Sequence, residues 1–253
     1  MHETTFDSYI ICTSPRSGST LLCDMLTATG LAGKPASYFF GISLEEWLEE
    51  LDMAPAETTS ERDVLEAVFA VALHKGRNGT GMFGLRMQAH GFAFFREKLA
   101  VLHPGNLSDR ERLERAFGAT LFVHLTRPDK LDQAVSYLKA QQTGLWHVAP
   151  DGSELERLAP QGEPRYDREA IRACVETMAA WDRDWNDWFV REGIEPLRIS
   201  YDDLSADPVG TLREVLDRLG FDASAADCVT PGVGKLADGT NQDWVARFRA
   251  GQE

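Results

Sequence analysis

The chain has 253 residues, of which 43% are hydrophobic, so it can bury one large core and we expect a single domain over residues 1–253. Its 26 basic and 40 acidic residues give a formal net charge of −14, which disfavours nucleic acid and anionic membranes as partners because both attract positive charge. The four cysteines show no C-x-x-C spacing, a pattern that suits a reducing cytoplasm. No signal-peptide pattern and no bilayer-length apolar run is visible, so we expect no membrane insertion.

Hydrophobic patterning predicts a chain in which strands and helices alternate. In chain order it predicts a strand over 9–13, helices over 20–28, 44–53 and 60–75, a strand over 82–87, helices over 91–102 and 109–117, a strand over 120–126, a helix ending near 142, a helix over 167–192, a strand over 197–200, and helices over 207–219 and 243–249. Strands separated by helices pair in parallel, so the predicted fold class is α/β, with a central, mostly parallel sheet flanked by helices. Ligands of such sheets bind beyond the carboxyl ends of the strands.

Two further predictions concern the segment 146–166 and the helix that follows it. Residues 146–166 are polar with several Gly and Pro residues, which predicts a long mobile loop. In the helix over 167–192, Trp181, Trp185 and Trp188 share one face, and this spacing favours packing in the core.

The first candidate anion site is the segment 14–20, which joins the first strand to the first helix. A loop in this position turns backbone N–H groups toward one point at the positive end of the helix. Gly18 allows close approach of the backbone, Arg16 adds a permanent charge, and hydroxyls come from Ser17, Ser19 and Thr20. One charge-assisted hydrogen bond contributes about 1.5–3 kcal/mol, so several together are enough to hold an anion.

A P-loop kinase that uses ATP and magnesium is the competing interpretation. Its motif needs an additional glycine at the start of the loop and a lysine after the second glycine, whereas Ser19 follows Gly18 here. Magnesium also calls for an acidic residue at a strand end, and the strand over 120–126 leads into Arg127 instead. Asp202, which follows the strand over 197–200, keeps the kinase interpretation open.

The second candidate anion site begins at Arg127, at the end of the strand over 120–126. Ser136 lies nine residues further on, within the next helix and offset from its apolar face. A mononucleotide needs one phosphate site, whereas a nucleotide with two separate phosphate groups needs two, at neighbouring strand ends. The two segments together therefore indicate the second kind of ligand.

These segments resemble the sulfotransferases that use 3′-phosphoadenosine-5′-phosphosulfate (PAPS), in particular the bacterial branch typified by trehalose 2-sulfotransferase. The similarity extends from about residue 8 to residue 249 and is most specific in the loop 14–22 and in the segment 127–146. Supporting similarity is found in the segments 84–87, 201–204, 235–238 and 243–247.

The resemblance implies a P-loop-like sulfotransferase fold and transfer of a sulfuryl group from PAPS to a hydroxyl of a carbohydrate-like or other small-molecule acceptor. Homodimers occur in this branch. No cluster of metal ligands is visible in the sequence, so we expect no metal. The residues that the resemblance assigns to PAPS are Arg16, Ser17, Gly18, Ser19 and Thr20 at the phosphosulfate, Arg127 and Ser136 at the 3′-phosphate, and Lys235 as a further contact to the nucleotide.

The acceptor side of the site is less clearly indicated. Tyr38, Phe39 and Trp146 offer flat surfaces for an acceptor ring, and Arg86 adds a basic group on a strand. In the mechanism that we expect, the acceptor oxygen attacks sulfur in line while Arg16 stabilises the charge that develops, so that positioning and electrostatics carry most of the catalysis.

One departure from the family pattern concerns the catalytic base. The branch carries a glutamate base two residues after a proline, and Ser37 stands at that position here. Serine is a poor proton acceptor near neutral pH, so the base is missing, displaced or unnecessary. Candidate replacements are His90, His147 and Asp52. A catalytically impaired nucleotide-binding homologue is therefore a third interpretation.

Overall fold

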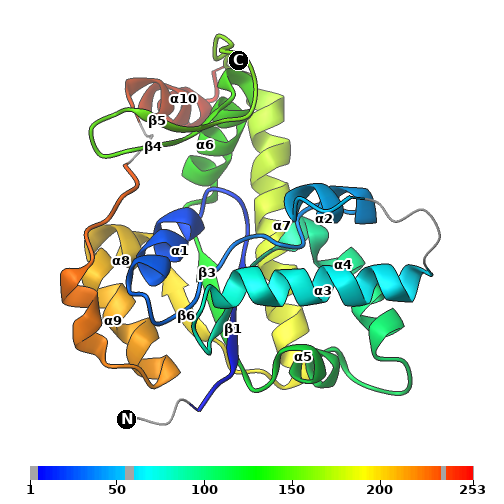
Figure 1. Cartoon of the computed structure of the whole chain (residues 1–253). Helices are drawn as coiled ribbons and strands as arrows, with labels where there is room; N and C mark the ends of the chain where they lie inside the picture. The colour runs from blue at the N-terminus through cyan, green and yellow to red at the C-terminus, as the bar shows by residue number, and fades with distance from the viewer. Residues whose placement is uncertain (1–4, 55–59, 235–237, 253) are drawn as a thin grey trace.

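The computed structural model describes residues 5–54, 60–234 and 238–252 (Figure 1). In chain order, its elements are β1 (Ser8–Thr13), α1 (Ser19–Ala28), α2 (Leu44–Glu50), α3 (Glu61–Arg77), β2 (Phe83–Gln88), α4 (Ala89–Leu102), α5 (Asp109–Phe117), β3 (Thr120–Thr126), α6 (Lys130–Thr143), β4 (Leu145–Val148), β5 (Glu154–Arg157), α7 (Arg168–Glu192), β6 (Leu197–Ser200), α8 (Tyr201–Ala206), α9 (Pro208–Leu219), the 3₁₀ helix η1 (Ala223–Cys228) and α10 (Gly239–Arg249).

The centre of the fold is a four-stranded sheet in the order β2-β1-β3-β6. All of its pairings are parallel, and Ile10 of β1 is level with Leu85 of β2 and Phe122 of β3. Successive side chains of a strand point to opposite faces, so Ile10 and Ile11 enter two different hydrophobic clusters. The predicted α/β class with helices on both faces of a parallel sheet is confirmed.

The cluster on the face covered by α2, α3, α4, α5 and α7 is rich in aromatic rings. Phe39 packs among Trp47, Phe69 and Phe95, with ring centroids 4.7–5.0 Å apart. Only 2% of Phe39 is exposed, and Tyr38 is 4% exposed with its hydroxyl donating to the carbonyl of Lys34. The prediction that these two rings line an acceptor pocket is corrected: the chain after Pro35 turns inward, and both rings contribute to the core.

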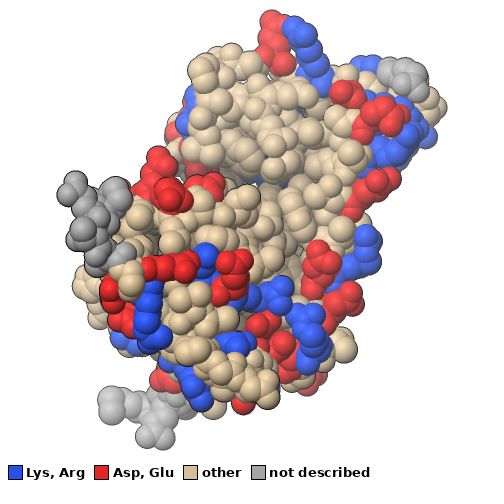
Figure 2. Space-filling model, turned by 90° about the vertical axis from the view of Figure 1, so that its right-hand side faces the viewer, with Lys and Arg blue, Asp and Glu red and all other residues tan. Residues whose placement is uncertain are grey.

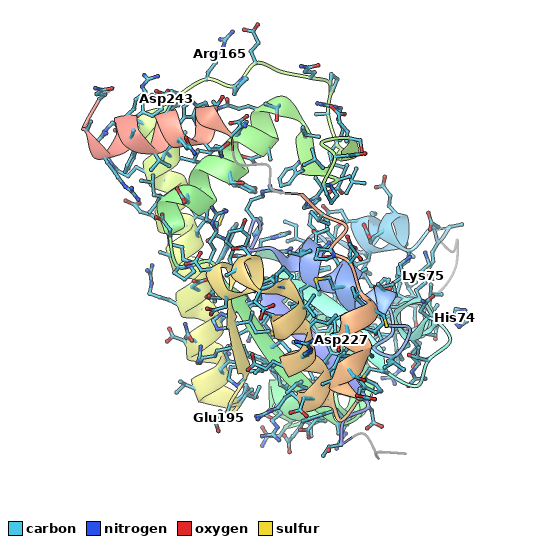
Figure 3. The ribbon with its side chains drawn as sticks, turned by 90° about the vertical axis from the view of Figure 1, so that its left-hand side faces the viewer. His74, Lys75, Arg165, Glu195, Asp227 and Asp243 are labelled. Atoms are coloured by element: carbon cyan, nitrogen blue, oxygen red, sulfur yellow. The ribbon has the colours of Figure 1, made fainter. Side chains whose placement is uncertain are left out.

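Helix α7 runs most of the height of the molecule beside the sheet (Figure 1). In Figure 3, Arg165, just before the helix, lies at the upper end, and Glu195, just after it, lies at the lower end. The indoles of Trp185 and Trp188 are buried and pack against Phe92, which confirms core packing for these two. Trp181 is half-buried and packs at the edge of a smaller cluster.

The segment 146–166 differs from its prediction. Instead of a loop throughout, it contains β5 and most of β4, which form an antiparallel hairpin with an irregular register. Gly152 has a φ of 85° at the turn, a conformation that glycine adopts without strain. Both strands have only four residues, and β5 is largely polar, so the segment lacks the longer apolar run that identifies a buried strand. The hairpin lies beside α6 and α10 at the upper end of the molecule (Figure 1).

Two smaller differences concern helices that begin earlier in the chain than the sequence predicts. Helix α8 begins at Tyr201, directly after β6, because the Ser200 hydroxyl accepts from the backbone N–H of Asp203 and caps it. Helix α10 begins at Gly239 rather than at 243, with Asp238 as its N-cap. Acidic and basic side chains are interspersed on the face in Figure 2. None of the described helices combines the length and apolarity needed to cross a membrane.

Candidate functional site

The loop between β1 and α1 is held in place by buried polar contacts. Gln133 of α6 is fully buried, and its amide nitrogen donates to Ser14 Oγ at 3.0 Å and to the carbonyl of Pro15 at 2.7 Å. The hydroxyl of Ser17 lies 2.5 Å from that of Thr13, in the interior. The prediction that the Ser17 hydroxyl adds a donor to an anion site is therefore corrected, because the loop turns this side chain toward the sheet.

The backbone of the loop leaves the start of α1 open. Gly18 is the N-cap of α1 with a φ of 86°, and no side chain caps the helix there. Arg16 has a φ of 63°, which is uncommon for a residue with a side chain. A Cβ atom at Gly18 would lie 2.8 Å from Cδ2 of Tyr201, so glycine is required for both conformation and space. The N–H groups that begin α1 are therefore available to an anion.

Arg16 joins the two candidate anion sites. Its Nε donates to Ser136 Oγ at 3.1 Å, and its NH1 donates to the carbonyl of Trp146 at 2.6 Å. Arg127 NH1 lies 3.5 Å from the carbonyl oxygen of Arg16. The structure thus brings Arg16, Arg127 and Ser136 together, although they come from the ends of two strands and from a helix.

The charges at this point are not balanced. Burial, and then the nearby charge of Arg127, lowers the pKa of Arg16 to about 10, so the group stays charged at neutral pH. Within the described residues, no carboxylate lies within 4.0 Å of the Arg16 guanidinium, and Arg127 has only Asp132 at 3.7 Å. Arg127 also lies 4.5 Å above the ring of Tyr201. Two adjacent guanidinium groups with so little compensation create a positive region, which favours the binding of an anion.

A cavity of about 260 Å³ opens beside Arg16 and Ser136. This volume is near the lower end of the range for small-molecule sites. Its other charged lining residues are Lys139, Glu154, Arg157 and Asp238. Lys235, which was predicted as a nucleotide contact, lies outside the described residues.

Arg86 of β2 organises the other side of the loop. Its Nε donates to Ser37 Oγ at 2.8 Å, and its NH1 donates to Thr20 Oγ1 at 2.9 Å. Ser37 is 6% exposed, so its hydroxyl serves as a partner of Arg86 in the interior. The predicted residues Thr20, Ser37 and Arg86 therefore form one connected group.

The three candidate bases lie in different surroundings. His147 of β4 places Nε2 3.1 Å from Thr20 Oγ1 and 3.3 Å from the carboxylate of Glu156. His90 is packed between the rings of Phe40 and Trp181. Asp52 is exposed and forms an ion pair with Lys75 at 2.9 Å. Of the three, His147 is the one that contacts the helix following the loop.

Sequence reasoning missed three contributors to the site. Gln133 supports the loop, Tyr201 packs under both Gly18 and Arg127, and Glu156 approaches His147. Tyr201 lies in a segment that the family resemblance singled out. No sequence signal marks Gln133 or Glu156, since both depend on how α6 and the hairpin pack. Within the described residues, no three His, Cys, Asp or Glu side chains are arranged to hold a metal ion.

Comparison with known proteins places the chain in a family. The family model for the Stf0 sulphotransferases matches residues 8–251. The chain belongs to the Stf0 sulphotransferase family. It is 30% identical to trehalose 2-sulfotransferase of Mycobacterium tuberculosis, over 96% of this chain and 94% of the relative. It is 28% identical to trehalose 2-sulfotransferase of Mycolicibacterium smegmatis, again over 96% of this chain and 94% of the relative. The resemblance seen in the loop motifs of this sulfotransferase thus extends over nearly the whole chain.

Proposed function

We propose that this sulfotransferase transfers a sulfuryl group from PAPS to a hydroxyl of a sugar, with trehalose as the first acceptor to test. The observation that carries the proposal is the meeting of Arg16, Arg127 and Ser136 beside the uncapped start of α1. Two cationic groups at one edge of a parallel sheet match a ligand with anionic groups at both of its ends. The names of the two relatives support a sugar as acceptor.

In this proposal, the loop and the two arginines hold opposite ends of PAPS. The N–H groups at the start of α1, with Arg16, bind the 5′-phosphosulfate, while Arg127 and Ser136 bind the 3′-phosphate. The acceptor oxygen forms a bond to sulfur as the bond from sulfur to the 5′-phosphate oxygen breaks, and 3′-phosphoadenosine 5′-phosphate leaves with the electron pair. Arg16 stabilises the charge that grows on that oxygen, and positioning supplies much of the remaining acceleration.

Two experiments with the purified full chain test the proposal: one measures nucleotide binding, and the other measures sulfuryl transfer. We expect 3′-phosphoadenosine 5′-phosphate to raise the melting temperature more than AMP does, because AMP lacks the 3′-phosphate. We expect radiolabelled PAPS to pass its label to trehalose. Equal stabilisation by ATP with magnesium would support a kinase instead. Binding of the nucleotide without label transfer to any sugar, phenol or peptide would identify a catalytically impaired homologue.

The cellular location is part of the same proposal. All four cysteines are free, and three of them are buried. Free cysteines are typical of proteins in a reducing cytoplasm, which is the location that we propose.

A further inference from the structure

A hydroxyl that attacks sulfur must lose its proton, and the side chains around Thr20 decide where that proton goes. We propose that His147, on the β4–β5 hairpin, is the general base of the reaction, and that Glu156 on the facing strand positions it and stabilises its protonated form. This inference rests on the proposed function. It assigns a chemical task to the hairpin, which the loop motifs do not indicate.

The geometry brings His147 to the place where the reaction begins. Thr20 is the second residue of α1, two positions after Gly18, and its Oγ1 lies 3.1 Å from His147 Nε2. The hairpin is held there by the hydrogen bond from Arg16 to the carbonyl of Trp146, the residue before His147. The same arginine that faces the anion site therefore fixes the strand that carries the imidazole.

The hydrogen bonds at Thr20 are compatible with the form of the imidazole that a base needs. Arg86 NH1 is always a donor, and it donates to Thr20 Oγ1 at 2.9 Å, so the Thr20 hydroxyl keeps its own hydrogen for His147 Nε2. The proposal takes the tautomer in which Nε2 is unprotonated and the ring hydrogen is on Nδ1. An unprotonated nitrogen beside the loop is what a general base requires.

The surrounding charges keep the imidazole neutral until the donor binds. Burial, followed by the charges of Arg16 and Arg86, lowers the pKa of His147 to about 4. The charged groups that face it are Arg16 from the loop, Arg86 from β2 and Glu156 from β5. The anionic phosphosulfate of PAPS would lie against Arg16 and offset its charge. The pKa of His147 then rises toward the working pH, where a base is most effective.

Other groups near the loop are poorer candidates. The Ser37 hydroxyl is engaged by Arg86 and has little basicity. The carboxylates of Asp24 and Glu50 are both influenced by the charge of Arg86, but neither forms a hydrogen bond to Thr20 or to His147. His147 combines contact with Thr20 at the helix start with an adjacent carboxylate.

The proposed step is balanced in protons and electrons. The acceptor oxygen gives its proton to His147 Nε2 as it bonds to sulfur, and the bond from sulfur to the 5′-phosphate oxygen breaks. Nε2–H then faces the Glu156 carboxylate, which lies 3.3 Å away and forms an ion pair with the imidazolium. Release of the proton to solvent restores the neutral base.

The experiment compares His147→Gln with the wild type, and uses His74→Gln, an exposed histidine on α3, as the matched control. Glutamine keeps a polar side chain that can accept from Thr20 but cannot take up the proton. We expect kcat for transfer from PAPS to trehalose to fall about 100- to 10,000-fold in His147→Gln. The rise in melting temperature on addition of 3′-phosphoadenosine 5′-phosphate should stay within about twofold of the wild-type rise. The control His74→Gln should keep the wild-type kcat.

Three further measurements separate a base from a structural residue. With 4-nitrophenol as acceptor, the decrease in kcat caused by His147→Gln should be much smaller, because the hydroxyl of 4-nitrophenol is far more acidic than that of a sugar. Glu156→Gln lowers kcat by a few fold at unchanged KM, and it shifts the acidic limb of the pH profile to lower pH, because the imidazolium loses its neighbouring carboxylate. Histidine NMR of the full chain shows the pKa of His147 rising when 3′-phosphoadenosine 5′-phosphate is added.

The outcomes distinguish this inference from the proposed function. If the wild type transfers sulfuryl groups and His147→Gln does so at a similar rate, the assignment of the base is wrong while the function stands. An equal loss with trehalose and with 4-nitrophenol, or a His147 pKa that does not rise with nucleotide, also overturns it. If the wild type binds no nucleotide, the proposed function and this inference both fail.

Discussion

Arg16 and Ser136 are 120 residues apart in the chain, yet the Nε of the first donates to the Oγ of the second at 3.1 Å. This contact joins the loop after β1 to helix α6, and it places the guanidinium where Arg127 also approaches. One structural relationship thus connects two segments that resemble separate phosphate sites in the sequence.

Arg127→Ala tests the second of these sites. Loss of one charge-assisted contact of about 1.5–3 kcal/mol should weaken binding of 3′-phosphoadenosine 5′-phosphate by roughly 10- to 150-fold. Isothermal titration calorimetry measures the change, and the melting temperature of the free protein reports any loss of packing on Tyr201. Arg213→Ala, which removes a half-exposed partner of Asp227, is the control and should leave the affinity unchanged. Equal affinity in wild type and Arg127→Ala would contradict this placement of the 3′-phosphate.

Gly18→Ala tests the backbone of the loop. An alanine held at a φ of 86° should lower the free energy of unfolding by about 1–2 kcal/mol. Its Cβ would also lie only 2.8 Å from Cδ2 of the Tyr201 ring. Gly79→Ala is a matched control, because Gly79 has a φ of 79° with open space around its Cβ position. Urea unfolding should show a loss of stability in both variants, with the larger loss in Gly18→Ala. Nucleotide affinity should fall in Gly18→Ala alone, and normal affinity there would argue against an anion at the start of α1.

Gln133→Ala tests the support of the loop from α6. The substitution leaves buried acceptors at Ser14 and Pro15 without their donor, which should lower the free energy of unfolding by about 1–3 kcal/mol. It should also weaken nucleotide binding, because the loop loses its fixed position. Gln141→Ala, on the exposed side of the same helix, should change neither quantity. The same stability in both variants would show that these buried contacts are dispensable.

The pH dependence of stability follows from His124, a buried residue of β3. Burial, followed by the charges of Arg198 and Lys130, lowers the pKa of His124 to about 4. The unfolded chain binds this proton near pH 6.5, so between pH 6.5 and 4 the unfolded state binds more protons and stability falls as pH falls. The contribution amounts to about 3 kcal/mol at most. Chemical denaturation of His124→Gln across this window should show a shallower slope, and parallel curves would contradict the assignment.

The layout of the fold could be predicted from the sequence because the central strands β1 and β3 are buried on both faces and are apolar runs. β1, β2, β3 and β6 all appear near their predicted positions. The hairpin β4–β5 could not be predicted in this way, since its strands have only four residues each, β5 is largely polar and the pairing is irregular. The start of α8 at Tyr201 was missed because a strand leads into a helix with no loop between them.

The residues of the candidate site were predictable where a motif fixes them and not where tertiary packing does. Arg16 and Gly18 come from one loop, and Thr20 from the first turn of the helix that follows it, a motif whose backbone requirements are visible in the sequence. Ser17 belongs to the same motif, but its hydroxyl turns inward to Thr13, which only the three-dimensional path of the loop reveals. Phe39 was assigned to a pocket on its chemistry alone, and aromatic residues are as well suited to a core.

The position of the Tyr201 ring affects how this site binds its ligand. The edge of the ring lies beside Gly18, and the Arg127 guanidinium lies over the face of the ring. Because an aromatic ring is rigid, the separation between the helix start and that cation is set before any nucleotide arrives. A preorganised separation of this kind reduces the conformational entropy lost on association. It also disfavours nucleotides whose two anionic ends are spaced differently.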